Sequence, residues 1–416
     1  MKKLLIITGA GASIDFGMPS VKYIDTLFEK WALEILPLKD DNTKSLYTWV
    51  KSSLLKYASQ NSGNRLDHIM GFENLLYTIQ NLHWLSRDID LSHHNHRLNP
   101  FININEFPEI IHIGKVKRAD SIDFSFLHSY LVDKLLDFFR GKCKSLYSNK
   151  QNELCLLSSF FKSLKTKFEL GFINLNYDNV LLSSVPDLNT GFDNLTGKFN
   201  RALLYESRWN FCYHMHGSVH FDMRGGDNNT EMHKIGWNND LNSSFRQNSS
   251  GRNKNYTSEG SDHLNSNIIT GLDKSNQLLR EPFASYFMQL DRLVYEADSI
   301  LFIGYGFHDN HLNSVFPFIR YDKNKTRKVV VIDWSLDNKD GLSHRRDNWH
   351  LGLYNTLPFN GHDMGISDGA LSQPVIFYKQ NHLLEKSKNP NRPLAVWYNG
   401  LLEACNHSDK ILLELI

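Results

Sequence analysis

The chain has 416 residues, of which 41% are hydrophobic and 22% are charged, and its formal net charge is +1. These values are ordinary for a soluble globular protein with room for a large core and more than one domain. A net charge this small excludes a global field that would recruit nucleic acid or an anionic membrane, and no long basic run indicates a direct nucleic-acid site.

The cysteines and the apolar runs indicate a cytoplasmic protein. The cysteines lie far apart, with no Cys-x-x-Cys pair, at positions Cys143, Cys155, Cys212 and Cys405. This spacing fits neither a disulfide framework nor a zinc ribbon, and it is typical of a reducing compartment. The apolar run at residues 4–7 is too short for a signal peptide, and no apolar stretch approaches the length needed to span a membrane.

The N-terminal stretch combines a strand with a glycine-rich turn. Residues 4–7 are aliphatic and predict a short buried strand, and residues 9–13 then read Gly-Ala-Gly-Ala-Ser. Apolar residues at helical spacing follow, from Val21 to Trp31. In this context a Gly-x-Gly turn is typical of a nucleotide site, because its backbone N–H groups can approach a diphosphate near a helix N-terminus. The same turn also serves purely structural connections between a strand and a helix.

The chain from there to about residue 170 has mostly helical periodicity. Apolar residues recur at helical spacing in four stretches, at residues 46–57, 72–82, 127–138 and 154–164. We expect a helical insertion at about residues 36–165. Between the second and third stretches, His93, His94 and His96 suggest a metal, but no carboxylate or cysteine accompanies them at ligand spacing. A solvated loop is the favoured interpretation.

Two polar side chains follow a strand in the middle of the chain. Residues 172–178 alternate between apolar and polar types, and they lead into apolar residues 180–182. This pattern predicts a strand that carries Asn176 and Asp178 to its carboxyl end, the edge at which doubly wound sheets bind ligands. Capping of the next helix would account for one of the two residues. Two more asparagines nearby favour a polar pocket.

A histidine-rich stretch follows at residues 212–220. In an extended segment His214, His216 and His220 would share one face, and three such histidines could bind zinc. No partner carboxylate is visible in this stretch. Gly217 directly after His216 suits a turn that presents one imidazole, whose ordinary pKa near neutrality suits acid–base work. We therefore favour a single functional histidine, His216.

The remaining sequence contains a polar loop and two further strands. Residues 224–267 are rich in Asn, Ser, Gly and charge, which predicts a mobile loop or lid. Residues 299–307 repeat the N-terminal pattern, with a buried strand followed by Gly-Tyr-Gly. Residues 328–332 predict another buried strand, and the carboxylate after it, Asp333, can accept hydrogen bonds from ribose hydroxyls or serve only as a turn residue. We expect residues 336–416 to pack on the core or to make subunit contacts.

Together these stretches resemble the sirtuin superfamily. Residues 9–13 with the Gly-Met-Pro of residues 17–19 look like its NAD loop, and residues 174–178 look like its Thr-Gln-Asn-Ile-Asp stretch. His216 and Gly217 look like its catalytic His-Gly, and residues 304–306 take the place of its Gly-Thr-Ser turn. The order and spacing agree across residues 1–335. The resemblance implies an α/β fold in which a Rossmann-like, doubly wound parallel sheet carries a helical insertion.

Two departures of this sequence from the sirtuin pattern point to one branch of the superfamily. Sirtuins that deacylate proteins carry a four-cysteine zinc ribbon after the catalytic histidine, whereas this chain has no cysteine between Cys212 and Gly304. The Asn-Tyr-Asp, His-Gly-Ser and Gly-Tyr-Gly-Phe motifs, with Asp309 nearby, look like a branch found in bacterial antiphage systems. Members of that branch hydrolyse NAD; some work beside a HerA-like ATPase, and others within Thoeris or Argonaute-linked systems. A chain of this length most resembles that HerA-associated kind.

The resemblance implies an NAD+ hydrolase (an NADase) that releases nicotinamide and ADP-ribose during abortive infection. Asn176 would orient the nicotinamide ribose or the attacking water, Asp178 would lie beside the carboxamide, and His216 would act as general base. NAD, as the substrate, would contact the residues of the two glycine turns and of the strand ends: Gly9, Ala10, Gly11, Ala12, Ser13, Gly17, Asn176, Asp178, Gly304, Tyr305, Gly306 and Asp333.

Other expectations concern alternatives and partners. A regulatory subunit that only binds NAD or ADP-ribose and a sirtuin-type protein deacylase are the alternative functions. A dehydrogenase is disfavoured because nothing indicates a second substrate for hydride transfer. We expect no metal and no membrane contact. We also expect a homo-oligomer whose activity depends on assembly, together with a HerA-like ATPase ring.

Overall fold

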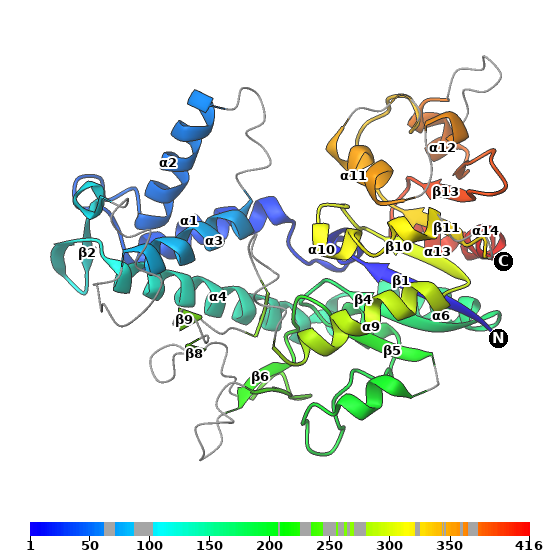
Figure 1. Ribbon diagram of the computed structural model, residues 1–416, viewed down its shortest axis with the longest axis horizontal. Coiled ribbons are helices and arrows are strands. Elements are labelled where there is room, and N and C mark those ends of the chain that lie inside the picture. Colours follow the sequence, from blue (N-terminus) through cyan, green and yellow to red (C-terminus); the bar gives the residue numbers. More distant parts are fainter. Residues whose placement is uncertain are drawn as a thin grey trace. The chain divides into compact units, whose positions relative to one another are not determined.

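The computed structural model describes the chain except for residues 62–70, 87–102, 207–208, 225–233, 244–254, 257–261, 264–266, 270–279, 321–324, 343, 345–346, 358–360 and 365–372. It divides into two compact units (Figure 1). Unit 1 consists of Met1–Met18, Lys142–Ser218 and Leu278–Ile416, and unit 2 consists of Pro19–Gly141 and Val219–Gln277. Within the described ranges, no helix is both long and apolar enough to cross a membrane.

Unit 1 is built on a seven-stranded sheet in the order β12-β13-β11-β10-β1-β4-β5. Its strands are β1 (Lys2–Thr8), β4 (Phe168–Asn174), β5 (Asn210–His214), β10 (Ser299–Ile303), β11 (Lys328–Ile332), β12 (Glu385–Lys386) and β13 (Leu394–Trp397). All neighbours are parallel except β12, which pairs antiparallel with β13. The predicted α/β class with a parallel sheet is therefore confirmed.

Helices cover both faces of this sheet. Phe172 of β4 packs edge-on against Phe161 of α6 (Gln151–Lys165), and Tyr213 of β5 stacks on Tyr286 of α9 (Phe283–Glu296). Ile173 is the register partner of Tyr213, so Phe172 and Tyr213 point to opposite faces of the sheet. The helices α6 and α9 therefore lie on opposite faces, as in a doubly wound fold, and the central strands are buried on both sides.

The order of the strands reverses beside β1. From β1 the chain adds β4 and β5 on one side, and it then crosses to the other side to add β10, β11 and β13. In parallel α/β sheets this switch point, at the carboxyl ends of the strands, is where a crevice for ligands forms. The glycine turn after β1 and the Gly-Tyr-Gly turn after β10 both lie at this point.

The sheet extends beyond residue 335. β13 pairs with β11 from Val329↔Leu394 to Ile332↔Trp397. The other described helices of unit 1 are α5 (Leu146–Asn149), α7 (Val180–Ser184), α10 (Asn310–Asn313), α11 (Asn348–Thr356), α12 (Val375–Gln380), α13 (Leu401–Asn406) and α14 (Ser408–Leu415). A domain boundary at residue 335 and subunit contacts by residues 336–416 stay predictions.

Unit 2 contains most of the predicted helices. They are α1 (Val21–Ile35), α2 (Leu46–Asn61), α3 (Phe72–Leu85) and α4 (Ser121–Lys144), whose last turn reaches unit 1. The fully buried ring of Phe28 packs edge-on against Tyr47 and Phe72, which joins α1, α2 and α3. The four stretches with helical periodicity lie in α2, α3, α4 and α6, so these helices are confirmed. The loop with His93, His94 and His96 lies outside the described residues.

Unit 2 also contains antiparallel hairpins that the sequence did not predict. They are β2 (Glu109–His112) with β3 (Lys115–Arg118), β6 (Phe221–Arg224) with β7 (Lys234–Trp237), and β8 (Asn255–Tyr256) with β9 (Asp262–His263). The predicted mobile loop at residues 224–267 is described only in part. Its described residues include β7, β8 and β9, and its mobility stays a prediction.

Candidate functional site

The two glycine turns pack directly on each other. The Gly9 and Gly11 amides donate to the oxygens of Ile303 and Gly304 at 2.9 and 3.0 Å. A Cβ on Gly9 would lie 2.6 Å from the Gly304 oxygen, and one on Gly304 (φ +57°) would lie 2.2 Å from the Ala12 nitrogen. Only glycine fits such a close approach of two backbones. These glycines therefore serve first to bring the turns after β1 and β10 together.

The chain after β1 forms two 3-10 turns, η1 (Ala10–Ala12) and η2 (Ile14–Phe16), before α1 begins at Val21. The sequence did not predict these turns. The amides of Ala12 and Ser13 donate within them, to the oxygens of Gly9 and Ala10 at 2.9 and 3.2 Å. The expected contacts of the Gly11, Ala12 and Ser13 amides with a diphosphate would therefore share or replace bonds that the protein already makes.

Asn176 holds the glycine turn from the β4 side. Its Nδ2 donates to the Gly9 oxygen at 2.8 Å and to the Ser13 Oγ at 3.0 Å. Asn174 Oδ1 accepts from the Asn176 amide at 3.1 Å and from the Thr8 hydroxyl at 2.8 Å. Both donor positions of Nδ2 are used in these bonds, and the carbonyl oxygen Oδ1, the acceptor of the side chain, is the atom of Asn176 that can bond to a ligand.

Asp178 is buried beside the same serine. Its carboxylate accepts hydrogen bonds from the Ser13 hydroxyl and, at 3.0 Å, from the Val180 amide at the start of α7. Burial raises the pKa of Asp178 above its ordinary value, although these hydrogen bonds oppose the shift. Capping thus accounts for part of the role of Asp178, and the bond to Ser13 places it in the same network as Asn176.

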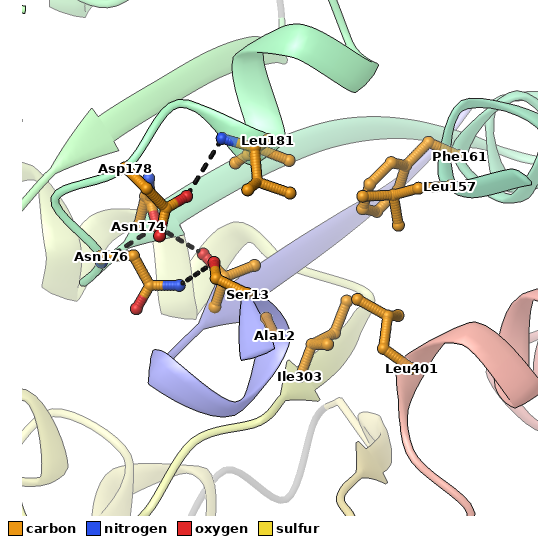
Figure 2. Close-up of a pocket in the computed structure, with 12 residues that line it drawn as sticks. Ala12, Ser13, Leu157, Phe161, Asn174, Asn176, Asp178, Leu181, Ile303 and Leu401 are labelled. Atoms are coloured by element: carbon orange, nitrogen blue, oxygen red, sulfur yellow. Dashed lines mark hydrogen bonds between the residues drawn. The ribbon is translucent and has the colours of Figure 1, made fainter. Parts of the chain in front are cut away.

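A small cavity lies beneath this network (Figure 2). Its volume is about 20 Å³, which is room for about one water molecule. Its polar wall consists of Thr8, Ser13, Asn174, Asn176 and Asp178, and its apolar wall includes Leu157, Phe161, Leu181 and Leu401. A cavity of this size lies under the turn and is not the space for a dinucleotide.

His216 follows β5 and pairs with a buried carboxylate. Its Nε2 lies 2.7 Å from Asp309 Oδ2, and the two side chains are 12% and 7% exposed. Gly217 has a φ of +109°, so the chain turns directly after His216. Asp309 also caps α10, since the Leu312 amide donates to its Oδ1 at 3.2 Å. The sequence indicated His216 by its local pattern, but only the resemblance drew attention to Asp309.

The other two histidines of that stretch have separate environments. His214 is fully buried, and its Nδ1 lies 3.3 Å from Asn174 Nδ2. His220 belongs to unit 2, where its Nδ1 lies 2.9 Å from the Asn238 oxygen, and burial lowers its pKa to about 4. Within the part of the chain that the structure describes, these histidines form no group that could hold a metal ion.

The remaining predicted residues lie at or near the carboxyl edge of the sheet. The side chain of Tyr305 is buried, and its hydroxyl donates to Asn313 Oδ1 at 2.7 Å. Tyr305 therefore stabilises the end of α10. Asp333 follows β11, where its amide donates to the Trp397 oxygen at 2.8 Å. Ala10 and Gly17 are exposed beside the turn.

One polar atom near Asp178 was not recognised from the sequence. Asn179 is 9% exposed, and its Oδ1 is buried without a hydrogen-bond partner among the described residues. Buried polar atoms of this kind are rare and call for an explanation. The run of asparagines at residues 174–179 was the available signal, and it did not distinguish Asn179 from Asn174.

Comparison with known proteins supports the resemblance over part of the chain. Residues 171–352 match the model of the SIR2-like domain. No curated protein matches the chain. Solved structures that match include a Sir2 homologue in complex with ADP-ribose, which is 11% identical with a TM-score of 0.31 over 86% of this chain and 87% of that one.

Two further solved structures match the chain with a similar identity, coverage and TM-score. A Sir2 homologue in complex with NAD is 10% identical, with a TM-score of 0.31 over 86% of this chain and 83% of that one. A Sir2 homologue with 2′-O-acetyl ADP-ribose is 11% identical, with a TM-score of 0.29 over 80% of each chain. The matched residues 171–352 include Asn176, Asp178, His216 and Asp309, and over this range the chain is similar to the SIR2-like domain.

Proposed function

We propose that this protein is an NAD+ hydrolase that releases nicotinamide and ADP-ribose. The observation that carries the proposal is the His216–Asp309 pair, because it lies within the stretch that matches the SIR2-like domain and gives the histidine a buried carboxylate partner. In the reaction the bond between ribose C1′ and the nicotinamide nitrogen breaks, and its electron pair leaves with nicotinamide. Water forms the new bond to C1′ and loses a proton.

His216 would receive that proton. With the Nε2 proton donated to Asp309, Nδ1 is the imidazole atom that can act as base. The carboxylate would then stabilise the imidazolium that forms and hold the ring in one orientation, as the third member of a nucleophile–base arrangement does. General-base catalysis of this kind contributes roughly 10²–10⁴-fold to a rate.

The Asn176 network would hold the other side of the reacting centre. Asn176 Oδ1 would accept a hydrogen bond from the attacking water or from a hydroxyl of the nicotinamide ribose, while the Nδ2 bonds to Gly9 and Ser13 would fix the orientation of the amide. Asp178 would lie beside the carboxamide. The dinucleotide would lie along the carboxyl edge of the sheet, with its diphosphate at the exposed side of the turn near Ala10 and Gly17, and its adenosine ribose at Asp333.

The motifs that resemble the defence branch also support a proposal about the biological setting. We propose that the enzyme acts in the cytoplasm, in antiphage defence by abortive infection, where depletion of NAD arrests the host cell. We also propose a homo-oligomer that works with a HerA-like ATPase ring. The support for this setting is the resemblance of the Asn-Tyr-Asp and Gly-Tyr-Gly-Phe motifs to the defence branch, and the absence of cysteines between Cys212 and Gly304.

The test is incubation of the purified chain with NAD, alone and with its partner ATPase, followed by chromatography of the products. We expect equal amounts of nicotinamide and ADP-ribose from the wild type, and none from His216→Ala or Asn176→Ala, each of which should still fold and melt cooperatively. His344→Ala, which removes an exposed histidine, is the matched control.

The alternatives predict other results. Nicotinamide release only with an acetyl-lysine peptide would identify a deacylase. NAD binding without turnover in any assembly state would identify a regulatory subunit. Loss of activity together with a collapsed melting temperature would assign His216 a structural role.

A further inference from the structure

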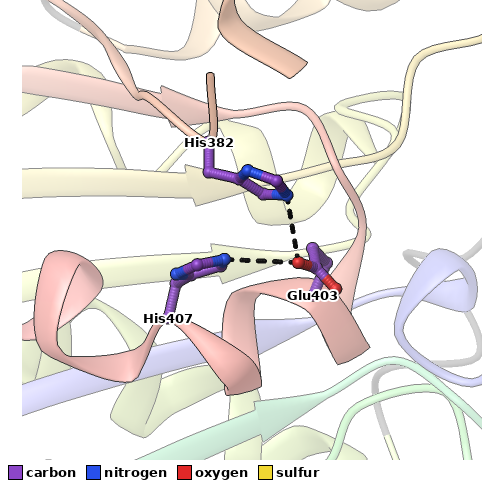
Figure 3. Close-up of side chains that lie close together, drawn as sticks. All are labelled: His382, Glu403 and His407. Atoms are coloured by element: carbon purple, nitrogen blue, oxygen red, sulfur yellow. Dashed lines mark ion pairs between the residues drawn. The ribbon is translucent and has the colours of Figure 1, made fainter. Parts of the chain in front are cut away.

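Three side chains with metal-binding atoms converge near the C-terminus of unit 1 (Figure 3). His382 lies in the loop after α12, Glu403 lies in α13, and His407 lies between α13 and α14. The Nε2 atoms of His382 and His407 are 3.2 and 3.3 Å from the same Glu403 Oε1. The donor atoms of all three residues lie within 4.8 Å of one another.

Helical spacing positions Glu403 and His407, and the conformation of a loop positions His382. Glu403 and His407 are four residues apart, a spacing that brings side chains to the same side of a helical turn. His382 has a φ of +49°, in the left-handed region that non-glycine residues rarely adopt. Its backbone oxygen accepts a hydrogen bond from Lys410 Nζ at 2.7 Å, which ties the loop to α14.

We propose that His382, Glu403 and His407 form a binding site for a divalent transition metal of the zinc class. Zinc binds imidazole nitrogen at about 2.0–2.1 Å and carboxylate oxygen at about 2.0–2.2 Å, usually with tetrahedral geometry. Two ligands of a tetrahedral zinc ion are then separated by roughly 3.3 Å. The distances from each histidine to the Glu403 oxygen already have this value.

The chemistry of the donors selects this class of metal. Two imidazoles and one carboxylate suit zinc and its neighbours in the first transition row, whereas calcium and magnesium prefer sites made of oxygen alone. The three side chains are 29–41% exposed, so a water molecule can fill the fourth position. As partly exposed ion pairs without a metal, these contacts contribute little to stability. The left-handed backbone of His382 belongs to the cap that ends α12, in which the Leu383 and His382 amides donate to the Tyr378 and Lys379 oxygens at 3.0 and 3.3 Å.

The metal would connect three elements of unit 1. It would tie the loop after α12 to the end of α13 and the start of α14. α13 also carries Leu401, which lines the small cavity beneath Ser13 and Asn176. The site therefore stabilises the C-terminal helices that support the candidate active site, and it takes no part in the proposed cleavage of NAD.

A buried tryptophan provides a local reporter of this site. The Trp397 ring is fully buried, with centroid distances of 5.6 Å to His407 and 6.3 Å to His382. Co²⁺ bound at the site would quench the fluorescence of Trp397, and the variant Trp397→Phe would lose this quenching while it still binds the ion. The signal therefore locates the bound ion without an assay of enzyme activity.

The test uses the untagged full-length chain, stripped with a chelator and then titrated with Zn²⁺ by calorimetry and with Co²⁺ by absorption and fluorescence. We expect binding of a single ion, a higher melting temperature with Zn²⁺, and quenching of Trp397. Glu403→Gln, His382→Ala and His407→Ala should each weaken the affinity by about tenfold or more. Glu403→Gln keeps the shape of the side chain, so it preserves the fold where a histidine variant unfolds.

Two controls separate this site from other histidines. His344→Ala removes an exposed histidine elsewhere in unit 1, and a variant with His93, His94 and His96 all replaced by Ala removes the histidine-rich stretch in the sequence. Both should bind the ion as the wild type does. The proposal is overturned if the wild type binds no Zn²⁺ at micromolar concentration, or if Glu403→Gln keeps the full affinity while the triple variant loses it.

Discussion

The imidazole of His216 and the carboxylate of Asp309 are paired at 2.7 Å, although they are far apart in the sequence of the matched SIR2-like stretch. His216 follows β5 at one edge of the sheet, and Asp309 follows the Gly-Tyr-Gly turn after β10, on the far side of β1. The sheet order therefore brings together two groups that no local motif connects. This pair is the most direct target for mutation.

Asp309→Asn should reduce kcat for NAD hydrolysis by roughly 10²–10⁴-fold, because it removes the charge that stabilises the His216 imidazolium. Asn is as good a helix cap as Asp, so α10 and the fold should be preserved. Steady-state kinetics should show a KM changed by no more than about threefold. Asp337→Asn, which removes an exposed carboxylate, is the control. If Asp309→Asn is as active as the wild type, Asp309 has no role in the proposed reaction.

Ser13→Ala should destabilise unit 1 by roughly 1–3 kcal/mol, because it leaves the buried Asn176 and Asp178 without a shared hydrogen-bond partner. NAD turnover should fall as Asn176 loses its fixed orientation. Urea denaturation and the nicotinamide assay measure the two effects. Ser159→Ala on the exposed side of α6 should change stability by less than about 0.5 kcal/mol. If the two variants behave alike, Ser13 does not organise the network.

Gly304→Ala should cost roughly 2–5 kcal/mol and abolish turnover, because alanine is strained at φ +57° and its Cβ would clash with the Ala12 nitrogen. Gly306 is the matched control, since its nearest contact for a Cβ is the flexible side chain of His308 at 3.3 Å. Gly306→Ala should cost less than about 1 kcal/mol. Thermal melts of the two variants compare them directly, and similar melting temperatures would contradict the close packing of the turns.

Acid should destabilise unit 2 through His128. Burial, with a smaller effect of His83, lowers the pKa of His128 from 6.5 to about 4. Between these values the unfolded chain binds a proton that the folded chain does not, so stability is full above pH 6.5 and falls as the pH decreases. Through His128 alone, the free energy of unfolding falls by about 1.4 kcal/mol for each pH unit in this range.

Hydrogen exchange of α4 amides between pH 7 and pH 4.5 measures this loss, after correction for the intrinsic exchange rate. His128→Leu should have a shallower slope by about one proton's contribution. His220, whose pKa burial also lowers to about 4, keeps its own contribution in that variant. His344→Ala should have the slope of the wild type. An unchanged slope in His128→Leu would contradict the assignment.

The sequence predicted the local elements well, because the buried residues of strands such as β1 and helices such as α3 form short, recognisable apolar patterns. It also predicted that Asn176, Asp178 and His216 follow strands, and in the structure they come after β4 and β5; their roles stay predictions. It did not predict that the Gly11 amide donates to the Gly304 oxygen, because that bond depends on how two glycine turns pack.

Local sequence patterns could not predict contacts between segments that are distant in the sequence. Asp309 pairs with His216 only because β5 and β10 belong to one sheet. The expectation that the protein holds no metal was based on cysteine spacing and on histidines that are close in sequence, and it stays untested. The group of His382, Glu403 and His407 was missed because a loop and two helices bring its members together. The β2–β3 hairpin was missed because its pattern is too short.

The position of β1 has a consequence for synthesis of the protein on the ribosome. β1 is made long before its neighbours in the sheet, which are β4, beginning at Phe168, and β10, beginning at Ser299. A sheet that depends on such non-local pairing assembles late and slowly. The nascent chain cannot form the Gly9–Gly304 contact or the His216–Asp309 pair until most of its length has emerged. A chain truncated before β10 therefore lacks both the second glycine turn and the carboxylate partner of His216.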